Sequence, residues 1–361
     1  MSAFFEWVQA NIKYFVGAGI LAANLYTFYN YFTGKSNNFQ ISPPSQQRDH
    51  PIRVKEIFIY PIKSCRGISV KSAKIDKLGF ELDRRWMIIN NGRFITQRQY
   101  PKMALIHPSL YKAEDGEEYL VISAEGEKEI RVKVNEDLSN KPTTKVGIWK
   151  DSVNVVDCGE EAHQWLTKFL GVDLHLVRVA PGSEYHRRIP EDYVDNIIDN
   201  ATEEQREQYQ FALCDTSQVM MVSESSIDDL NQHIVATRKQ NNEQQRDPVT
   251  VYNFRPNVLL SSCTPFEEDT WTQVRISGLL LKKVQYTPRC KLTTVDPNKG
   301  VLNPFDDDEP LRTLRAYREF DQKLLFGVLF VHEQDQNGYE INVGDIVDVL
   351  GSTSDPYPIK K

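Results

Sequence analysis

The sequence predicts a mixed α+β protein in which β structure dominates. Between residues 53 and 156, short β-prone runs recur at regular spacing and are separated by glycine or polar turns, which is typical of a β-barrel or a β-sandwich. Helical periodicity is confined to a few segments, the clearest at residues 162–170. The sequence lacks GxGxxG, P-loop, GxSxG and HExxH motifs, so Rossmann, P-loop, α/β-hydrolase and zincin folds have no motif support.

The composition is that of a soluble globular body with one large or two ordinary domains. The chain has 361 residues, of which 40% are hydrophobic and 26% are charged. Its net charge of −7 argues against general nucleic-acid binding, so any anionic ligand requires a local cluster of Arg and Lys. The five cysteines form no CxxC pair and match no zinc spacing, which indicates reduced thiols in a cytosol-facing compartment.

A membrane anchor is predicted for residues 1–35. Residues 14–34 carry no charge, and these 21 residues are about long enough to cross a bilayer. Aromatic residues crowd the second half of the stretch, as at a membrane interface, and a secretory signal peptide would have a shorter apolar core. The alternative is an amphipathic helix that lies on a surface or a partner. The polar, proline-containing residues 36–51 are expected to form a linker.

Residues 52–180 are predicted to form a first, β-rich domain. A strand containing Val54, Ile57 and Ile59 opens it, and the runs on either side of Asn90-Asn91-Gly92 carry the signal of a β-hairpin. One helix interrupts the strands at residues 162–170, where Gly171 ends the periodic run. Further strands are expected at residues 104–110, 119–122, 130–134, 143–149, 153–156 and 174–179.

Residues 181–352 are predicted to form a second domain, with the boundary at Pro181-Gly182. The polar residues 181–210 suit a long loop or lid, and the alternative is a disordered insertion. Ser225 and Asp228 are placed as a capping pair for a helix at residues 226–234, and residues 236–248 are expected to be a loop. A short helix is expected at residues 311–318, and strands at residues 219–222, 258–260, 279–286, 328–331 and 346–350.

Cys290 is the most informative single residue. The β-prone run before it ends at Pro288, which cannot donate to a sheet ladder, so Cys290 should lie on a loop at a strand end. Its neighbours Arg289 and Lys291 favour a thiolate over a thiol. Such a thiolate suits attack on an electrophile or binding of a soft metal, while the plainer alternative is a buried structural cysteine.

Polar clusters at other predicted strand ends offer further candidate groups. Sites collect at such loops, although each cluster taken alone is more often solvated surface. Together they could hold a phosphate and a polar heterocycle, because they combine cations with hydrogen-bonding side chains. These residues are Lys63, Ser64, Arg85, Thr216, Ser217, Arg255 and Asn257.

In their order along residues 53–351, these clusters resemble the MOSC-domain proteins, and among them the mitochondrial amidoxime-reducing components. Two positions depart from the family pattern, since Gln218 stands in place of a proline and Lys299 in place of a small or hydroxylic residue. The resemblance implies a β-barrel-like MOSC N-terminal domain and a mixed β-barrel MOSC domain, preceded by a single membrane-anchor helix. It rests on Tyr60-Pro61-Ile62-Lys63-Ser64-Cys65, Asp83-Arg84-Arg85-Trp86, Asp215-Thr216-Ser217, Asn253-Phe254-Arg255-Pro256-Asn257 and Arg289-Cys290-Lys291-Leu292-Thr293-Thr294-Val295-Asp296-Pro297.

The resemblance also implies a molybdenum cofactor, which is a pterin dithiolene ending in a phosphate. Cys290 matches the cysteine that ligates molybdenum, and a soft metal is compatible with a thiolate ligand. A cofactor with a phosphate and anionic sulfurs needs cations in a protein of net charge −7. Lys63, Ser64, Arg85, Ser217 and Arg255 match positions that hold the pterin and phosphate, and Thr216, Asn257 and Arg289 are additional candidates.

The activity that the resemblance implies is the two-electron reduction of N-hydroxylated compounds, such as amidoximes and hydroxylamines, to amidines and amines. Electrons would come from NADH through cytochrome b5 reductase and cytochrome b5, and the sequence has no NADH or haem motif of its own. The implied location is the mitochondrial outer membrane, with the catalytic body facing the cytosol. Asp215 and Asp296 are candidate proton donors, although aspartates in such loops more often cap turns.

Two alternative functions stay open. One is a sulfur carrier in cofactor maturation, with a persulfide on Cys290. MOSC-containing sulfurases carry a large pyridoxal-phosphate domain, for which 361 residues leave no room, so pyridoxal phosphate is not expected. The other is a non-catalytic protein that stores the cofactor or acts as a membrane scaffold.

Overall fold

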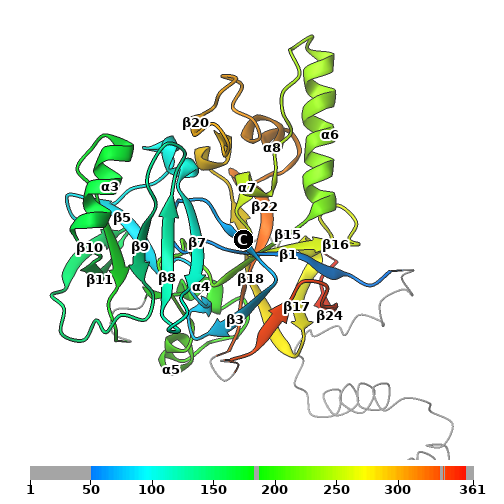
Figure 1. Ribbon diagram of the computed structural model, residues 1–361. Helices are drawn as coiled ribbons and strands as arrows, with labels where there is room; N and C mark the ends of the chain where they lie inside the picture. The colour runs from blue at the N-terminus through cyan, green and yellow to red at the C-terminus, as the bar shows by residue number, and fades with distance from the viewer. Residues whose placement is uncertain (1–49, 183–186, 334–335, 337, 355–361) are drawn as a thin grey trace, which may run out of the picture.

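The computed structural model describes residues 50–182, 187–333, 336 and 338–354 (Figure 1). The membrane anchor predicted for residues 1–35 lies outside the described residues, as does nearly all of the linker predicted for residues 36–51. No helix within the described ranges is long and apolar enough to cross a membrane.

A closed five-stranded barrel forms the core of the first half, on the left in Figure 1. Side-chain alternation along one strand shows how it is filled. Met87 and Ile89 pack with the other strands of the barrel, whereas Trp86 and Ile88 pack in a separate apolar cluster. The strand order is β10 (Thr144–Ile148), β11 (Asp151–Asp157), β12 (His175–Val179), β5 (Trp86–Asn90) and β6 (Arg93–Phe94).

The predicted hairpin and the first predicted helix are both confirmed. Asn91 and Gly92, between β5 and β6, have φ angles of 47° and 71°, as the type I′ turn of a two-residue hairpin requires. α3 (Glu160–Leu170) ends at Gly171, which adopts the left-handed conformation with φ of 77°. Its buried face includes Trp165, which packs in the same cluster as Trp86 of the barrel.

A three-stranded antiparallel sheet lies beside the barrel in Figure 1. Leu120 and Ile122 of this sheet share one apolar cluster with Trp165 of α3. The barrel, helix and sheet therefore form one packed lobe. The strands of the sheet are β7 (His107–Lys112), β8 (Glu118–Ser123) and β9 (Ile130–Lys133).

A nine-stranded mixed sheet organises the second half. Every strand pair is antiparallel except β15 with β16. The sheet curls, because Val54 at the start of the first strand hydrogen-bonds with Gly344 and Asp345 and Ile52 accepts from Val347. Eight strands follow the order β2 (Ile68–Val70), β1 (Arg53–Ile59), β16 (Val258–Ser261), β15 (Val219–Ser223), β22 (Lys323–Val331), β18 (Leu279–Pro288), β17 (Trp271–Ile276) and β24 (Val347–Ser352), and β21 (Glu319–Phe320) pairs with β22.

The long helix α6 (Glu224–Gln240) differs from its prediction at both ends. Its N-cap is Ser223, whose hydroxyl accepts from Ser226 N at 3.2 Å, so the predicted pairing of Ser225 with Asp228 is wrong. The helix also continues through part of the expected loop at residues 236–248. Arg238 is buried there and pairs with Asp307, a contact across 69 residues that local sequence cannot reveal. The predicted short helix is confirmed as α8 (Leu311–Tyr317).

The expected loop or lid at residues 181–210 contains short regular elements from residue 187 onward. β13 (Arg187–Arg188) pairs with β14 (Gln210–Phe211), and α4 (Glu191–Val194) and α5 (Glu203–Glu207) lie between them. The capping box at the start of α5 joins Thr202 and Gln205 reciprocally. Local capping therefore orders residues 187–210, and a disordered insertion is wrong for this part.

Strand pairing connects the two predicted domains. β1 belongs to residues 52–180 in the sequence but pairs with β16 in the large sheet, and β3 (Ser72–Asp76) pairs with β23 (Glu340–Asn342). The division at residue 180 stays a prediction. The remaining elements are β4 (Gly79–Phe80), η2 (Pro101–Leu105), α7 (Val251–Phe254), η4 (Glu267–Thr270), η5 (Lys291–Thr294), β19 (Val295–Asp296) and β20 (Val301–Leu302).

Candidate functional site

A cavity of about 1260 Å³ lies where the barrel lobe meets the large sheet. Its wall combines chain segments that are far apart in the sequence: the segment after β1, the start of β15, the turn from α7 into β16, and the end of β18. The barrel lobe adds Arg98 and Trp149. Concave sites of this size at the junction of two units commonly bind small molecules and cofactors.

Most of the residues predicted to hold a cofactor line this one cavity. The exception is Arg85, which does not line it. The eight that do are Lys63, Ser64, Thr216, Ser217, Arg255, Asn257, Arg289 and Cys290. The fold therefore brings together groups that the sequence could only propose as separate clusters.

Arg84 lines the cavity, whereas the sequence predicted that the adjacent Arg85 would contact the cofactor. The Arg85 guanidinium donates to both carboxylate oxygens of Asp76, at 2.7 and 2.8 Å. Arg84 instead lines the cavity and donates to Asp83 at 2.6 Å. Burial alone would lower the pKa of Arg84, but Asp83 holds it above its usual value. Arg84 has a φ of 49°, so the chain turns at this residue and the two neighbouring arginines part.

Lys63 is a buried cation that the wall holds in place. Its Nζ donates to Leu213 O at 2.8 Å and also pairs with Asp215, whose carboxylate accepts from Trp149 Nε1 at 3.1 Å. Burial lowers the pKa of Lys63, and Asp215 opposes that shift. Burial would raise the pKa of Asp215, but Lys63 holds it well below its usual range. Asp215 is therefore ionised near neutral pH and orients Lys63, which argues against its candidacy as a proton donor.

Asp296 caps the turn between β19 and β20. Its carboxylate accepts from the backbone N–H groups of Asn298 and Lys299, at 2.9 and 3.0 Å. It does not line the cavity. The turn-capping alternative therefore describes Asp296 better than a role as proton donor.

Arg255 presents a guanidinium group held against an aromatic ring. Its Cζ atom lies 4.3 Å from the centroid of the Tyr60 ring, and its Nη1 donates to Cys65 O at 2.6 Å. The ring of Tyr60 also contacts Arg84, at 4.2 Å. Burial lowers the pKa of Arg255 to about 10. In the described part of the chain, no carboxylate forms an ion pair with Arg255.

Cys290 is exposed at the cavity wall, so a buried structural cysteine is wrong. β18 ends at Pro288, and Cys290 is the N-cap of η5, which confirms the predicted strand-end position. The sulfur accepts from Arg98 Nη1 at 3.2 Å. Arg98 belongs to the barrel lobe and lies 192 residues away in the sequence, so the contact depends on the fold. A sulfur beside a guanidinium group at the edge of a cavity is placed to ligate a soft metal.

Arg289 faces the interior rather than the sulfur of Cys290. Its Nε and Nη2 donate to Phe326 O at 2.8 and 2.6 Å, and its Nη1 donates to Phe254 O at 3.0 Å. Burial lowers the pKa of Arg289 to about 9. Like Arg255, it has no carboxylate partner within the described ranges. Cations that lack an anionic partner are costly away from water, and a bound anion would offset that cost.

Ser217 and Asn257 mainly support the wall. Ser217 Oγ donates to Phe330 O at 2.7 Å. The Asn257 side chain donates to Phe58 O and accepts from Met220 N, each at 3.2 Å. These bonds join β1, β15 and β22 at the edge of the cavity, and Thr216 lines it beside them.

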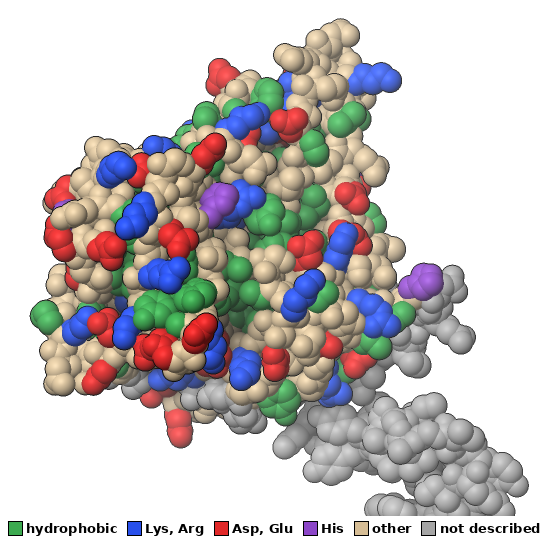
Figure 2. Space-filling view, viewed as in Figure 1, with side chains coloured by type: hydrophobic (Ala, Val, Ile, Leu, Met, Phe, Trp, Pro, Cys, Tyr) green, Lys and Arg blue, Asp and Glu red, His purple; other side chains and the backbone are tan. Residues whose placement is uncertain are grey.

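Basic side chains predominate in the cavity lining. The chain as a whole has a net charge of −7, and both signs are interspersed over the face seen in Figure 2. The cavity is thus a local positive site on an acidic protein, as a bound anionic ligand would require. The lining contains Lys63, Arg84, Arg98, Lys150, Arg187, Arg188, Arg206, Arg255 and Arg289 against Asp151, Glu191, Glu203 and Asp215.

One residue of the cavity wall has a buried hydroxyl group without a partner. Thr287 lines the cavity, and its Oγ1 is buried with no hydrogen-bond partner among the described residues. A buried polar group without a partner is unusual, because it loses its bonds to water and gains none. Arg255 and Arg289, which have no carboxylate partner in the described ranges, make the cavity suited to an anionic ligand.

Sequence reasoning missed several residues of the wall. Arg98 and Trp149 come from turns of the barrel lobe, and nothing local marks either residue as part of a site. Arg187 is buried and bridges Asp151 and Cys214 O beneath the cavity. Arg84 stood in a cluster that the sequence did single out, so only the choice between two adjacent arginines was missed.

Two family descriptions match this chain. The family described as "MOSC N-terminal beta barrel domain" matches residues 51–173, and the family described as "MOSC domain" matches residues 208–348. The first contains every strand of the closed barrel except β12, and the second contains most of the large sheet. Both segments contribute residues to the cavity.

Curated relatives match most of the chain. It is 34% identical over 308 residues to "Mitochondrial amidoxime reducing component 2" of Bos taurus, covering 81% of this chain and 82% of that protein. It is 34% identical over 312 residues to "Mitochondrial amidoxime-reducing component 1" of Homo sapiens, covering 82% and 83%. A solution structure of a Bordetella bronchiseptica protein aligns with a TM-score of 0.28 at 24% identity, covering 34% of this chain and 88% of that one, which is too low to support an argument.

Proposed function

We propose that this chain, which belongs to the MOSC-domain family, is a molybdenum-cofactor enzyme that reduces N-hydroxylated compounds. The mitochondrial amidoxime-reducing components are relatives of this chain and support the proposal. The substrates proposed are amidoximes and hydroxylamines, and the products are amidines and amines. The single observation that supports this most strongly is the cavity, in which an exposed cysteine thiol and an excess of cations face the same space.

The residues present fit such a cofactor. The phosphate and pterin would be held by Lys63, Arg84 and Arg255, of which Arg255 lacks an anionic partner within the described ranges. Ser64 would supply a hydrogen-bonding group to a polar ring system, and so would Thr287 if its buried hydroxyl turned toward the cavity. Cys290 offers the thiolate ligand for the metal. When bound, a molybdenum cofactor supplies two-electron redox chemistry.

The chain's own contribution is to bind, orient and polarise. Arg98 donates to Cys290 Sγ and so fixes the direction of the sulfur. Asp215 stays ionised and holds Lys63 at the wall. Trp149, which is half exposed, packs edge-on against Phe94 and lines the cavity, would offer an aromatic contact to a planar substrate.

The proposal extends to electron donors and location. NADH, through cytochrome b5 reductase and cytochrome b5, is proposed as the electron source, and the relatives named mitochondrial support a mitochondrial location. The uncharged residues 14–34 are proposed as an anchor in the outer membrane, with the body on the cytosolic side.

The test is a metal and turnover assay on the full chain made in a host that synthesises the cofactor. We expect molybdenum near one atom per chain and reduction of benzamidoxime with reduced cytochrome b5. Absence of molybdenum would refute the proposal, and molybdenum without turnover would favour the non-catalytic alternative.

Cys290→Ser tests the assigned ligand. It should abolish turnover, whereas Cys263→Ser, in the loop that follows β16, should retain it. Full turnover in Cys290→Ser would show that the thiolate assignment is wrong.

A further inference from the structure

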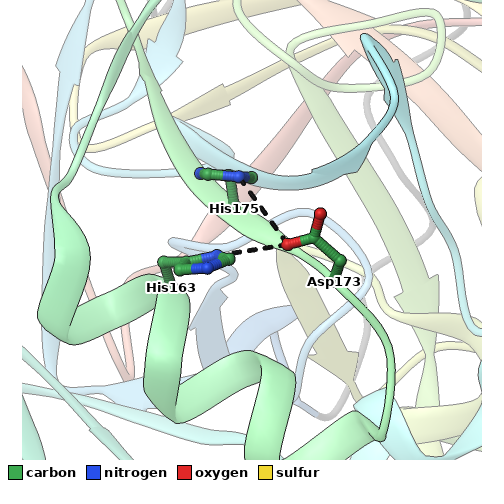
Figure 3. A group of neighbouring side chains, drawn as sticks. All are labelled: His163, Asp173 and His175. Carbon is green, nitrogen blue, oxygen red and sulfur yellow. Dashed lines mark ion pairs between the residues drawn. The ribbon is translucent and has the colours of Figure 1, made fainter.

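Two histidines and an aspartate meet outside the cavity lining, on the barrel lobe (Figure 3). His163 comes from α3, Asp173 from the loop that follows it, and His175 from β12. One nitrogen of each imidazole and one carboxylate oxygen lie within 4.8 Å of one another. Asp173 Oδ1 is 3.6 Å from His163 Nδ1 and 4.0 Å from His175 Nε2.

Hydrogen bonds at Nδ1 orient both imidazole rings. His175 Nδ1 lies 2.8 Å from Asp157 Oδ2, and His163 Nδ1 lies 3.0 Å from Leu174 O. A carboxylate and a carbonyl only accept, so each Nδ1 donates and Nε2 is the nitrogen that each ring can offer to a metal. A ring N–H that donates to a carboxylate or a backbone carbonyl is the usual support of a metal-binding histidine.

The local charge also favours a cation. The two rings stack with centroids 4.3 Å apart and planes 20° from parallel. Asp157 and Asp173 place two carboxylate groups beside these rings, which favours a cation at this position. A divalent ion would offset the charge of these carboxylates.

The three ligand atoms would have to move only slightly closer together to bind one metal ion. Zinc holds nitrogen and oxygen ligands at about 2.0–2.2 Å, so ligand atoms around it lie roughly 3–3.5 Å apart. The Asp173 side chain is 75% exposed and the His175 side chain 42% exposed, so both have room to rotate. Imidazole and carboxylate ligands suit zinc, copper and nickel ions.

We propose that His163, Asp173 and His175 bind a divalent transition-metal ion of the zinc type, with water completing its coordination. The ion would clip α3 to β12 on the outside of the barrel. Asp157 acts as a positioning residue, because it orients His175 without being one of the three ligands. The site is separate from the proposed cofactor site, since none of these four residues lines the cavity.

The test is a calorimetric titration of the full-length holoprotein with zinc chloride after removal of loosely bound metal. We expect the wild type to bind one more zinc ion per chain than the double variant His163→Ala/His175→Ala. Asp157→Asn should weaken binding about tenfold, as expected for loss of a group that orients a metal-binding histidine.

His233→Ala is the matched control. His233 also faces a carboxylate, Asp229 at 3.3 Å, and it stacks on the ring of Tyr317 at 4.3 Å instead of on a second histidine. Its replacement should leave zinc binding unchanged. Equal loss in His233→Ala, or wild-type stoichiometry and Kd in the double variant, would overturn the proposal.

Two further measurements guard the result. If the double variant does not fold, Asp173→Asn replaces it, because this exposed side chain can change without disturbing the apolar core. Zinc affinity equal to that of the wild type in Asp173→Asn would then refute the proposed metal site. Cobalt chloride distinguishes the ligands: absorption without a thiolate charge-transfer band supports nitrogen and oxygen ligands, and a thiolate band that survives in the double variant would place the metal on a cysteine instead.

Discussion

Replacing Thr287 by valine should have opposite effects on the cofactor-free and cofactor-loaded protein. The Thr287 hydroxyl is buried at the cavity without a hydrogen-bond partner within the described part of the chain. A buried polar group left unpaired costs about 1–3 kcal/mol. Valine has nearly the same shape and lacks the hydroxyl, so the cofactor-free variant should be more stable than the wild type by about 1 kcal/mol or more.

In the cofactor-loaded protein, Thr287→Val should lower stability instead of raising it. If the ligand bonds to Thr287 Oγ1, valine removes a hydrogen bond worth about 0.5–1.5 kcal/mol. That corresponds to roughly a two- to tenfold weaker affinity for the cofactor. Thermal unfolding of protein made in cofactor-deficient and cofactor-competent hosts measures both effects, and about 1 kcal/mol should move Tm by roughly 2–4 °C for a domain of this size.

Thr294→Val is the control. Thr294 is also buried, but its hydroxyl donates to Lys291 O at 2.9 Å, so valine should destabilise both forms. The reasoning about Thr287 would be refuted if Thr287→Val lost stability in both forms, as the control does. Equal stabilisation in both forms would show that the ligand makes no use of this hydroxyl.

Three other predictions rest on the same structure. Arg84→Gln should lower cofactor affinity about ten- to a hundredfold, because it removes a charged hydrogen bond worth roughly 1.5–3 kcal/mol. Arg85→Gln should leave the molybdenum content near that of the wild type, because Arg85 pairs with Asp76 outside the cavity lining. The opposite result would assign Arg85 to the site. Burial raises the pKa of Glu268 from 4.5 to about 7, so the folded state binds more protons than the unfolded state between these pH values. The free energy of unfolding should therefore fall by up to about 3 kcal/mol as the pH rises from 4.5 to 7. Glu268→Gln should flatten this pH dependence in denaturant titrations, and an unchanged slope would contradict the assignment. Gly327→Ala should lower the free energy of unfolding by about 2–4 kcal/mol, because φ is 83° and the new methyl group would lie 2.6 Å from Val222 Cγ2. Gly92→Ala, where φ is 71° and the space is open, should lower it by only about 1 kcal/mol. Similar losses for both variants would mean that the close contact at Gly327 is relieved.

Gln218 shows how a departure from a family pattern can have a structural reason. The resemblance placed a proline at this position, before β15. The Gln218 side chain donates to Gln210 O at 2.8 Å and accepts from His332 N at 2.9 Å. It thereby ties the segment after α5 and the end of β22 to the start of β15. A proline has no side-chain amide and could make neither bond.

The sequence by itself determined the local features of this fold. The alternation of Trp86, Met87, Ile88 and Ile89 fixed a strand buried on both sides, because successive side chains point to opposite faces. The periodic face of α3 and the turn glycines were readable for the same reason, since their signals lie within a few residues. Pro288 fixed the end of a strand, and so placed Cys290 at a strand end.

Only the tertiary structure decided which side chains surround Cys290. Arg289 is the sequence neighbour of Cys290, but its guanidinium binds backbone carbonyls in the interior, while Arg98 from the barrel lobe contacts the sulfur. Likewise Arg84 lines the cavity and the adjacent Arg85 pairs with Asp76. Sequence proximity sets neither side-chain direction nor the meeting of two lobes, because both follow from backbone torsions and packing summed over the whole chain.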